Sequence, residues 1–170
     1  MEFIDLGRQY ELIRDELNES IQKILDSRKY IMGPEIVEME KQLAEFCGRK
    51  YCLSCASGTD ALVIPLMAWG LEKTDAVFVP SFTFFASAES VVLAGGTPVF
   101  VDSDDSFNIS PAALEQAIEN VIEEGKLKPR GIIPVDLFGL SADYDAIMPI
   151  AEKEEVKRET SVLSLDCLWG

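Results

Sequence analysis

From residue 51 onward, short apolar runs alternate with segments whose apolar residues recur at helical spacing. The expected strands are 51–55, 76–79, 98–101, 131–135 and 161–165. The expected helices between them are 59–69, 86–94, 111–124 and 142–155. Short continuous apolar strands separated by helices are typical of βαβ units, in which a parallel sheet is covered on both sides. The pattern therefore predicts an α/β fold with a mainly parallel sheet and helices on both faces.

Two helices are expected before the first of these strands. Over 6–27, apolar residues recur at helical spacing with charged residues between them, which predicts an amphipathic helix. Gly33 and Pro34 interrupt that pattern, and Pro34 suits the first position of a second helix that ends near Cys47. Because both helices precede the strands, we expect them to cover the domain or to reach a second subunit. The sequence has no evident internal repeat, low-complexity segment or domain boundary.

The charge of the chain narrows the classes of partner. Its 170 residues include 30 acidic and 15 basic side chains, a formal net charge of −15 at pH 7. A strongly acidic surface repels nucleic acid and anionic membranes, so neither is expected as a partner. The absence of histidine removes the commonest metal ligand and general base. With no signal-peptide pattern and no uninterrupted apolar span, a cytoplasmic protein is expected.

Two of the four cysteines have the spacing of a metal or redox motif. Cys52 and Cys55 form the CxxC pair, whereas Cys47 and Cys167 have no such close partner. A lone pair is a weak signal, and we expect both cysteines to be buried in the first strand and its turn as small hydrophobic side chains. The acidic stretch 102–105 lacks the central glycine and closing glutamate of a calcium loop. No metal site is expected.

The candidate site lies at the carboxyl ends of the strands, where open parallel sheets bind ligands. Ser57, Gly58 and Thr59 follow the first expected strand and open a helix. The unpaired N–H groups and the positive dipole end of such a helix suit a phosphate, although a simple helix cap is the alternative interpretation. The sequence has neither GxGxxG nor GxxxxGK[ST], so dinucleotide and Walker-type sites lack their fingerprints.

Aromatic and acidic residues follow the next strands. Phe82, Phe84 and Phe85 come after the second strand. They are most simply core aromatics, but a ring at this place can also stack on a flat ligand. Asp102 and Asp136 end the two strands that follow, either as catalytic carboxylates or as solvated caps.

In combination and in order, these segments resemble the DegT/DnrJ/EryC1/StrS family of sugar aminotransferases, which are fold-type I pyridoxal-phosphate enzymes. The matching segments are Ile4-Asp5-Leu6, Gln9-Tyr10, Tyr30 to Glu35, Glu38, Glu40, Ser57 to Leu62, Pro80 to Phe84, Ala86, Gly96 to Asp102, Asn108 to Pro111, Ile133 to Gly139 and Ala142-Asp143. The resemblance extends over about residues 1–153. Within the family, the sequence looks most like enzymes that aminate a 3-keto sugar on a uridine diphosphate carrier.

The resemblance implies pyridoxal 5′-phosphate as the cofactor. Ser57, Gly58 and Thr59 would hold its phosphate through backbone N–H groups and the Thr59 hydroxyl. Phe84 would stack on its pyridine ring. The implied substrates are a nucleotide-linked ketosugar and glutamate, the usual amino donor of the family.

Family members are homodimers that build their active sites from two chains, so the resemblance also implies a homodimer or larger self-association. Tyr30, Gly33 and Pro34 would lie near the dimer interface and the substrate.

The last part of the chain departs from the family pattern. The family has an aspartate that pairs with the pyridine nitrogen, and later a Ser-x-x-x-Lys segment whose lysine forms the Schiff base. Asp166 is the candidate for that aspartate, but it comes several residues late, and no lysine has the matching context. We therefore expect an incomplete large domain over 1–170, with a divergent tail over 154–170 and no C-terminal small domain. Truncation, or a disrupted reading frame near Lys153, would explain this.

Two functions of different classes fit the sequence. The first is the N-terminal part of a sugar aminotransferase, inactive as this chain because it has no Schiff-base lysine and hence no catalytic residue. The second is a non-catalytic module of the same fold that binds phosphate ligands or dimerises. A dinucleotide enzyme would need the missing glycine fingerprint. A family dehydratase with histidine in place of the lysine stays open, because the deciding position lies outside the matched segments.

Overall fold

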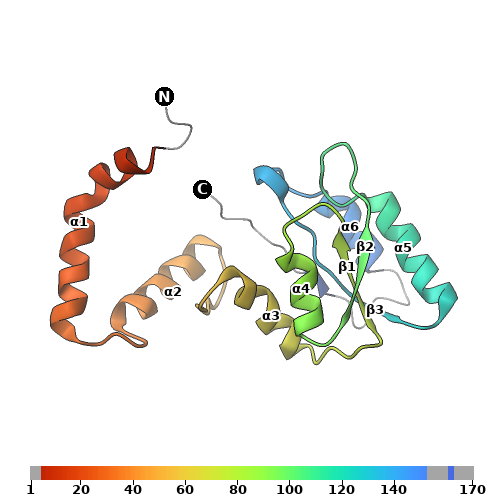
Figure 1. Ribbon diagram of the computed structural model, residues 1–170, viewed down its shortest axis with the longest axis horizontal. Helices are drawn as coiled ribbons and strands as arrows, with labels where there is room; N and C mark the ends of the chain where they lie inside the picture. The colour runs from red at the N-terminus through yellow and green to blue at the C-terminus, as the bar shows by residue number, and fades with distance from the viewer. Residues whose placement is uncertain (1–4, 153–160, 163–170) are drawn as a thin grey trace. The chain divides into compact units, whose positions relative to one another are not determined.

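The computed structural model describes residues 5–152 and the strand residues 161–162. The chain divides into two compact units, Met1–Ser54 and Cys55–Gly170 (Figure 1). The first unit contains two helices, and the second contains a parallel sheet with its helices. Within the described ranges, every helix is too short or too polar to serve as a membrane span.

Both predicted helices of the first unit are confirmed, as α1 (Leu6–Ser27) and α2 (Pro34–Phe46). The Asp5 carboxylate caps α1 by accepting the Arg8 N–H at 2.9 Å. Gly33 caps α2, and Pro34 takes the first helical position, where no N–H is needed. A Cβ at Gly33 would lie 2.7 Å from the Lys29 carbonyl oxygen, so this turn admits only glycine.

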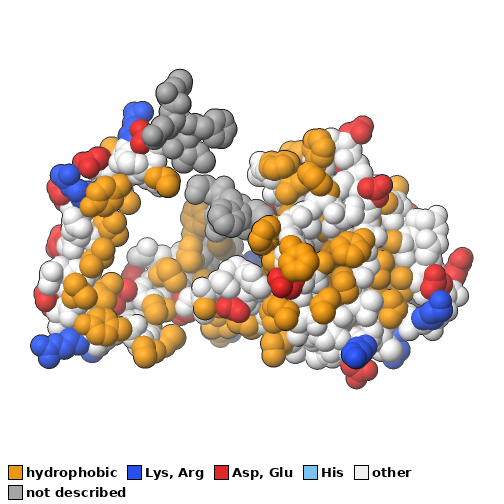
Figure 2. Space-filling view, viewed as in Figure 1, with side chains coloured by type: hydrophobic (Ala, Val, Ile, Leu, Met, Phe, Trp, Pro, Cys, Tyr) orange, Lys and Arg blue, Asp and Glu red, His pale blue; other side chains and the backbone are white. Residues whose placement is uncertain are grey.

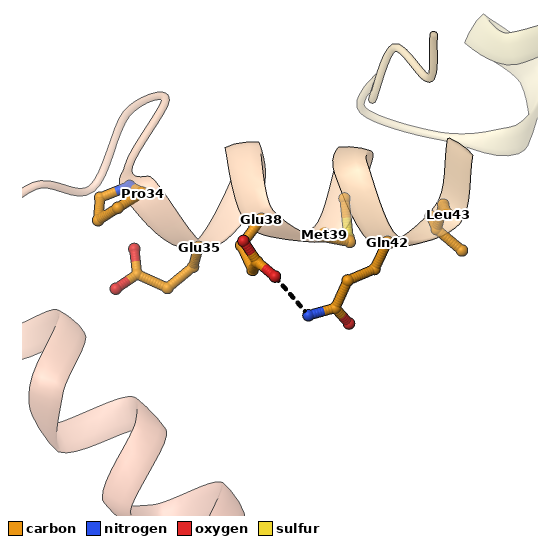
Figure 3. Close-up of a pocket in the computed structure, with 6 residues that line it drawn as sticks. All are labelled: Pro34, Glu35, Glu38, Met39, Gln42 and Leu43. Carbon is orange, nitrogen blue, oxygen red and sulfur yellow. Dashed lines mark hydrogen bonds between the residues drawn. The ribbon is translucent and has the colours of Figure 1, made fainter. Parts of the chain in front are cut away.

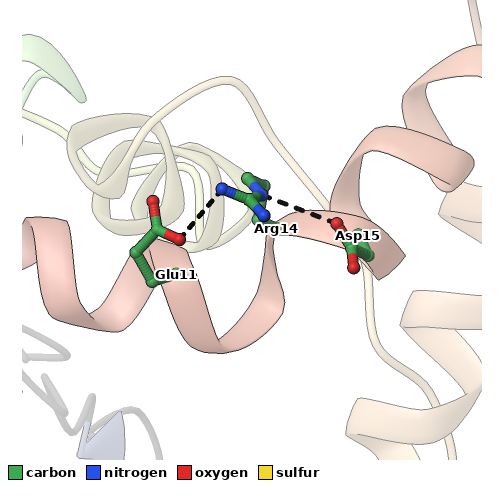
Figure 4. A network of polar contacts seen from close by, with 3 residues as sticks. All are labelled: Glu11, Arg14 and Asp15. Carbon is green, nitrogen blue, oxygen red and sulfur yellow. Dashed lines mark hydrogen bonds and ion pairs between the residues drawn. The ribbon is translucent and has the colours of Figure 1, made fainter.

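The first unit leaves most of its large apolar side chains exposed. Within its described range, α1 buries no residue. Figure 2 shows hydrophobic side chains gathered along one side of α1 and charged side chains along the other. The charged side includes Arg14, which contacts Glu11 at 3.0 Å and Asp15 at 3.5 Å (Figure 4). Such exposed ion pairs contribute little to stability. The stability of α1 therefore depends on whatever covers its apolar stripe, the row of apolar side chains that includes Leu17 and Ile21.

Among the described residues, the second unit contains four parallel strands in the order β2-β1-β3-β4. Their bounds are β1 (Asp75–Pro80), β2 (Thr97–Val101), β3 (Lys128–Ile132) and β4 (Ser161–Val162). Every pair of neighbours is parallel, and Ala76 lies opposite Thr97 on β2. Pro98 stands on the edge strand β2, where its missing N–H disfavours further pairing. The prediction of a parallel sheet is confirmed.

Side chains of the central strand β1 alternate between two cores. Ala76 and Phe78 face the core that contains residues of α5 (Pro111–Glu124) and α6 (Tyr144–Ala151). Val77 and Val79 face the opposite core.

That opposite core contains residues of α3 (Gly58–Ala68) and α4 (Ala86–Leu93). The prediction of helices on both faces is therefore confirmed, and α4 and α5 lie on opposite sides of the sheet (Figure 1). Burial of one large apolar side chain such as Phe78 stabilises the fold by about 1.5–3 kcal/mol.

The predicted strand over 51–55 is wrong. This segment is irregular, and Tyr51 and Leu53 are exposed. None of the described strands pairs with it, so its backbone lacks the ladder that a strand requires. The predicted burial of the cysteines is wrong for Cys55, which is exposed, whereas Cys52 is half-buried. Cys167 lies outside the described residues.

The predicted strand over 131–135 begins and ends three residues too late. In the structure β3 starts at Lys128, which pairs with Asp75, and it ends at Ile132. Ile133 and Val135 are nonetheless buried, because the chain continues through the core after the ladder ends. A run of apolar residues predicts burial, and here the buried segment continues beyond the last residue of β3 that pairs with β1.

Candidate functional site

Within the part of the chain that the structure describes, the start of α3 is a capped helix end with two free N–H donors. The Ser57 hydroxyl accepts the Asp60 N–H at 3.1 Å, and the Ser57 carbonyl accepts the Ala61 N–H at 3.0 Å. The N–H groups of Gly58 and Thr59 have no hydrogen-bond partner among the described residues. Helix N-termini with free donors favour anions. The Ser57-Gly58-Thr59 turn therefore provides the donors that a phosphate needs.

The space beside Gly58 is open. A Cβ at this position would meet no atom within 4 Å, and Gly58 does not have the positive φ that favours glycine. The described fold therefore does not require glycine here, whereas close approach of a ligand to the backbone would. Asp60 lies in the same first turn and accepts a hydrogen bond from Ser57 at 3.1 Å. Its charge favours the helix but competes with any anion that binds there.

The three phenylalanines after β1 are exposed, so their interpretation as core aromatics is wrong. They precede α4, which buries small residues, among them Ala86 and Ser90, instead. Phe82, Phe84 and Phe85 are thus available to a ligand or a partner. The stacking role of Phe84 stays a prediction.

The two strand-end aspartates have local structural partners. Asp102 is exposed, and its side chain accepts the Ser103 N–H at 2.9 Å. Asp136 is half-buried, and its Oδ1 accepts the Ala142 N–H at 2.8 Å and the Tyr144 hydroxyl at 3.1 Å. These contacts match caps that hold a turn. They give neither carboxylate a catalytic partner.

Sequence reasoning missed Asn108 as a fixed polar residue. Asn108 is 2% exposed, and its carboxamide accepts the Leu137 N–H at 3.0 Å and donates to the Leu140 carbonyl at 2.8 Å. It therefore joins the loop after β2 to the short 3₁₀ turn η1 (Leu137–Gly139). A loop asparagine carries no sequence signal of burial, because its partners lie about thirty residues away in the chain.

The loop after β2 is tightened by a second acidic residue. The Ser106 hydroxyl and N–H both donate to Asp104, and these two hydrogen bonds lower the pKa of its carboxyl group. The hydroxyl is the larger cause. Both oxygen-directed contacts therefore hold the Asp104 side chain within its own loop.

The residues predicted at an interface lie in the first unit. The Tyr30 hydroxyl donates to the Leu25 carbonyl at 3.4 Å, and Gly33 and Pro34 begin α2. A groove runs along α2 from Pro34 (Figure 3). Its lining residues are Pro34, Glu35, Glu38, Met39, Gln42 and Leu43. The interface role of this segment stays a prediction.

The predicted site residues therefore belong to two separate units. Ser57, Gly58, Thr59 and Phe84 are in the second unit, whereas the predicted interface residues are in the first. Asp166 lies outside the described residues. Among the described residues, no group of three or more histidine, cysteine, aspartate or glutamate side chains is placed to hold a metal.

The fold agrees with the comparison to a family model. Residues 11–158 match the model of the DegT/DnrJ/EryC1/StrS aminotransferase family. The chain belongs to this family.

Two solved structures and one curated relative illustrate the similarity. The chain is 47% identical over 154 residues to the UDP-2-acetamido-2-deoxy-3-oxo-D-glucuronate aminotransferase of Pseudomonas aeruginosa, covering 90% of this chain and 41% of the relative. It is 50% identical to a DegT/DnrJ/EryC1/StrS aminotransferase from Brucella abortus, with a TM-score of 0.91 over 96% of this chain and 43% of that one. It is 30% identical to NtdA from Bacillus subtilis with bound cofactor PMP, with a TM-score of 0.81 over 96% of this chain and 36% of that one. The chain thus spans about two fifths of the length of such relatives.

Proposed function

We propose that this chain is the N-terminal part of a pyridoxal-phosphate-dependent aminotransferase that acts on a nucleotide-linked ketosugar, with glutamate as amino donor. The observation that carries the proposal is the pair of N–H groups at the start of α3 that lack a partner among the described residues, in a chain of this family. The activity named for the Pseudomonas relative supports the substrate class, and the PMP-bound structure supports the cofactor class.

The residues at this turn fit the phosphate of the cofactor. Gly58 and Thr59 supply two N–H donors, the Thr59 hydroxyl a third, and the open space beside Gly58 admits an anion. The dipole of α3 adds a favourable field at the same point. Phe84 would offer a ring face to the pyridine. When bound, the cofactor supplies an electron-withdrawing ring that stabilises negative charge on the substrate carbon.

The family uses a lysine to link the cofactor, and no lysine of this sequence has the matching context. We therefore expect the 170-residue chain to hold the cofactor only through non-covalent contacts and not to transaminate. Borohydride treatment in the presence of cofactor should place no stoichiometric label on any single lysine. Stoichiometric reduction onto one lysine, or measurable amino transfer, would contradict this.

A second candidate is a non-catalytic association module of the same fold. The uncovered apolar stripe of α1 favours this candidate, because an amphipathic helix of 22 residues gains most of its stability from packing. Under either function, we expect the chain to form a homodimer or larger assembly in which Tyr30, Gly33 and Pro34 lie near the contact.

A titration with pyridoxal phosphate, followed by amide NMR, tests the leading proposal. The Gly58 and Thr59 amide signals should shift, and pyridoxal without the phosphate should leave them unchanged. The start of α5 is an internal control, because Ser110 caps that helix in the same way. Equal shifts at both helix ends would indicate nonspecific anion binding and would contradict the proposal.

The variant Gly58→Pro sharpens this test. Proline suits the first position of a helix, as Pro34 and Pro111 show in this chain, so the fold should persist while one donor is lost. Binding should weaken about tenfold, the effect of removing a hydrogen bond to a charged group. Thr59→Val should weaken binding in the same direction.

A further inference from the structure

Two exposed phenylalanines of the second unit have a left-handed backbone. Phe107 has a φ of 66° and is 56% exposed, and Phe138 has a φ of 57° and is 82% exposed. This conformation is unfavourable for a bulky residue, and it persists only where surrounding contacts enforce it. A turn without further purpose is ordinarily built with glycine or asparagine at such a position. Both loops therefore hold an aromatic side chain in solvent at a conformational cost.

One buried residue holds both loops. Asn108 directly follows Phe107, and its carboxamide bonds to Leu137 and Leu140, the residues that bracket Phe138 and Gly139. Its backbone carbonyl accepts the Asp104 N–H at 3.1 Å. Because Asn108 is desolvated, each of these hydrogen bonds is costly to break. The two phenylalanines are thus displayed by loops that share one anchor.

Further contacts restrict each loop. The Phe107 N–H donates to the Asp104 carbonyl at 3.0 Å, and Asp136 fixes the end of the second loop through Ala142. The Phe107 ring also lies 5.8 Å from the Phe82 ring, at an interplanar angle of 46°. The loops that follow β1, β2 and β3 therefore each contribute an exposed ring.

The charges of these loops restrict what the rings can bind. The loops 102–110 and 136–143 contain no lysine or arginine. Their acidic residues are Asp102, Asp104, Asp105, Asp136 and Asp143. Such loops repel a phosphate, and they also repel a second copy of a chain whose net charge is −15. An uncharged flat ring has no such penalty, and aromatic side chains bind such rings by stacking.

We propose that Phe107 and Phe138, extended by Phe82, form a stacking surface for the nucleobase of the substrate, and that Asn108 is its positioning residue. This inference rests on the proposed function and names the part of the chain that recognises the nucleotide. The base would lie against the rings, while its phosphates stay clear of the acidic loops.

Titration of the full chain with uridine, a base without phosphate, tests the proposal by saturation-transfer NMR. The affinity should fall about tenfold or more in Phe138→Ala and in Phe107→Ala, as expected for the loss of a base–aromatic stack. Phe100→Ala is the matched control, because Phe100 is also exposed in this unit but lies on β2. Asn108→Ala removes both side-chain hydrogen bonds that join the two loops, so it should weaken uridine binding. Circular dichroism under the conditions of the titration checks that the variant is folded.

Absence of saturable uridine binding at millimolar concentration would overturn the proposal, and so would equal affinity in the phenylalanine variants. A change of oligomeric state in Phe138→Ala with unchanged uridine affinity would assign the surface to another copy of the chain, and would overturn it as well. Failure of the proposed function is distinguishable: Gly58→Pro should affect pyridoxal phosphate and leave uridine binding unchanged. If the unmodified chain binds only one of the two ligands, the proposal for the other ligand is wrong.

Discussion

Two amphipathic helices of this chain, α5 and α1, differ in whether their apolar side chains are buried. In α5, Leu114 and Ile118 are 0% and 5% exposed against the sheet. In α1, Leu17 and Ile21 are 39% and 47% exposed. Both helices were predicted from apolar periodicity and both form. The pattern decides where a helix forms, whereas burial depends on a second surface that only the second unit provides for its helices.

The same contrast holds between the whole units. The second unit buries apolar side chains on both faces of its sheet, whereas the first buries Ala44 as its one buried apolar side chain among the described residues. The second unit thus has the means to stabilise itself, and the first depends on a surface beyond its own two helices.

The largest effect should come from the matched pair of leucines. Leu114→Ala removes a fully buried side chain and should lower the free energy of unfolding by about 2–5 kcal/mol. Leu17→Ala should change it by less than about 1 kcal/mol, because its side chain is already exposed. Urea unfolding of the two variants measures both. If both variants lose the same free energy of unfolding, the apolar side of α1 is covered in solution, and the proposed difference between the two helices is wrong.

Asn108 should have the next largest effect. Asn108→Ala leaves the Leu137 N–H and the Leu140 carbonyl without their partner, so stability should fall by about 1–3 kcal/mol. Asn120→Ala is the control, because Asn120 is exposed on α5 and bonds to Gln116 on the same helix. Thermal unfolding of both variants decides. If Asn120→Ala lowers the stability as much as Asn108→Ala does, Asn108 does not act as a buried anchor between the two loops.

Self-association tests what covers the stripe of α1. If a second copy covers it, Leu17→Glu should weaken association about tenfold or more, since a buried charge without a partner is costly at an interface. Asp15→Lys also changes the charge of the helix but lies on its polar side, and should have a much smaller effect. Sedimentation velocity measures both. An unchanged association constant in Leu17→Glu would exclude the stripe as the contact.

The smallest effect concerns pH. The N–H and then the hydroxyl of Ser54 donate to Glu40, and they lower the pKa of its carboxyl group. A depressed pKa means that this contact stabilises the fold above the ordinary pKa of glutamate, about pH 4.3, and is lost as the pH falls further. The Ser54 amide signal should therefore titrate below that pH, and Glu40→Gln should abolish the titration. Titration of this amide that persists in Glu40→Gln would contradict the assignment.

Periodicity predicted the layers of the fold because each apolar residue reports only that it will be buried. It failed for 51–55, where the apolar run has no strand to pair with among the described residues. It failed in the opposite direction for Phe84, whose ring is exposed because α4 buries small residues instead. The pattern predicts that a residue is buried, but it does not identify the strand or helix against which that residue packs.

The candidate site was predictable only in part. The Ser57-Gly58-Thr59 turn has a local signature, since a helix cap and its glycine are adjacent in the sequence. The anchor at Asn108 joins two loops that are distant in the chain, so no spacing rule reveals it. A site feature formed by residues that are adjacent in the chain can be predicted from the sequence. A feature formed by tertiary contacts, such as the Asn108 anchor, is found only in the structure.

Crystals of the chain soaked with pyridoxal phosphate test the central claim most directly. We expect the phosphate within hydrogen-bond distance of the Gly58 and Thr59 N–H groups, with Phe84 against the ring. A phosphate bound elsewhere, or side chains filling the space beside Gly58, would contradict the assignment of this helix start as the cofactor anchor.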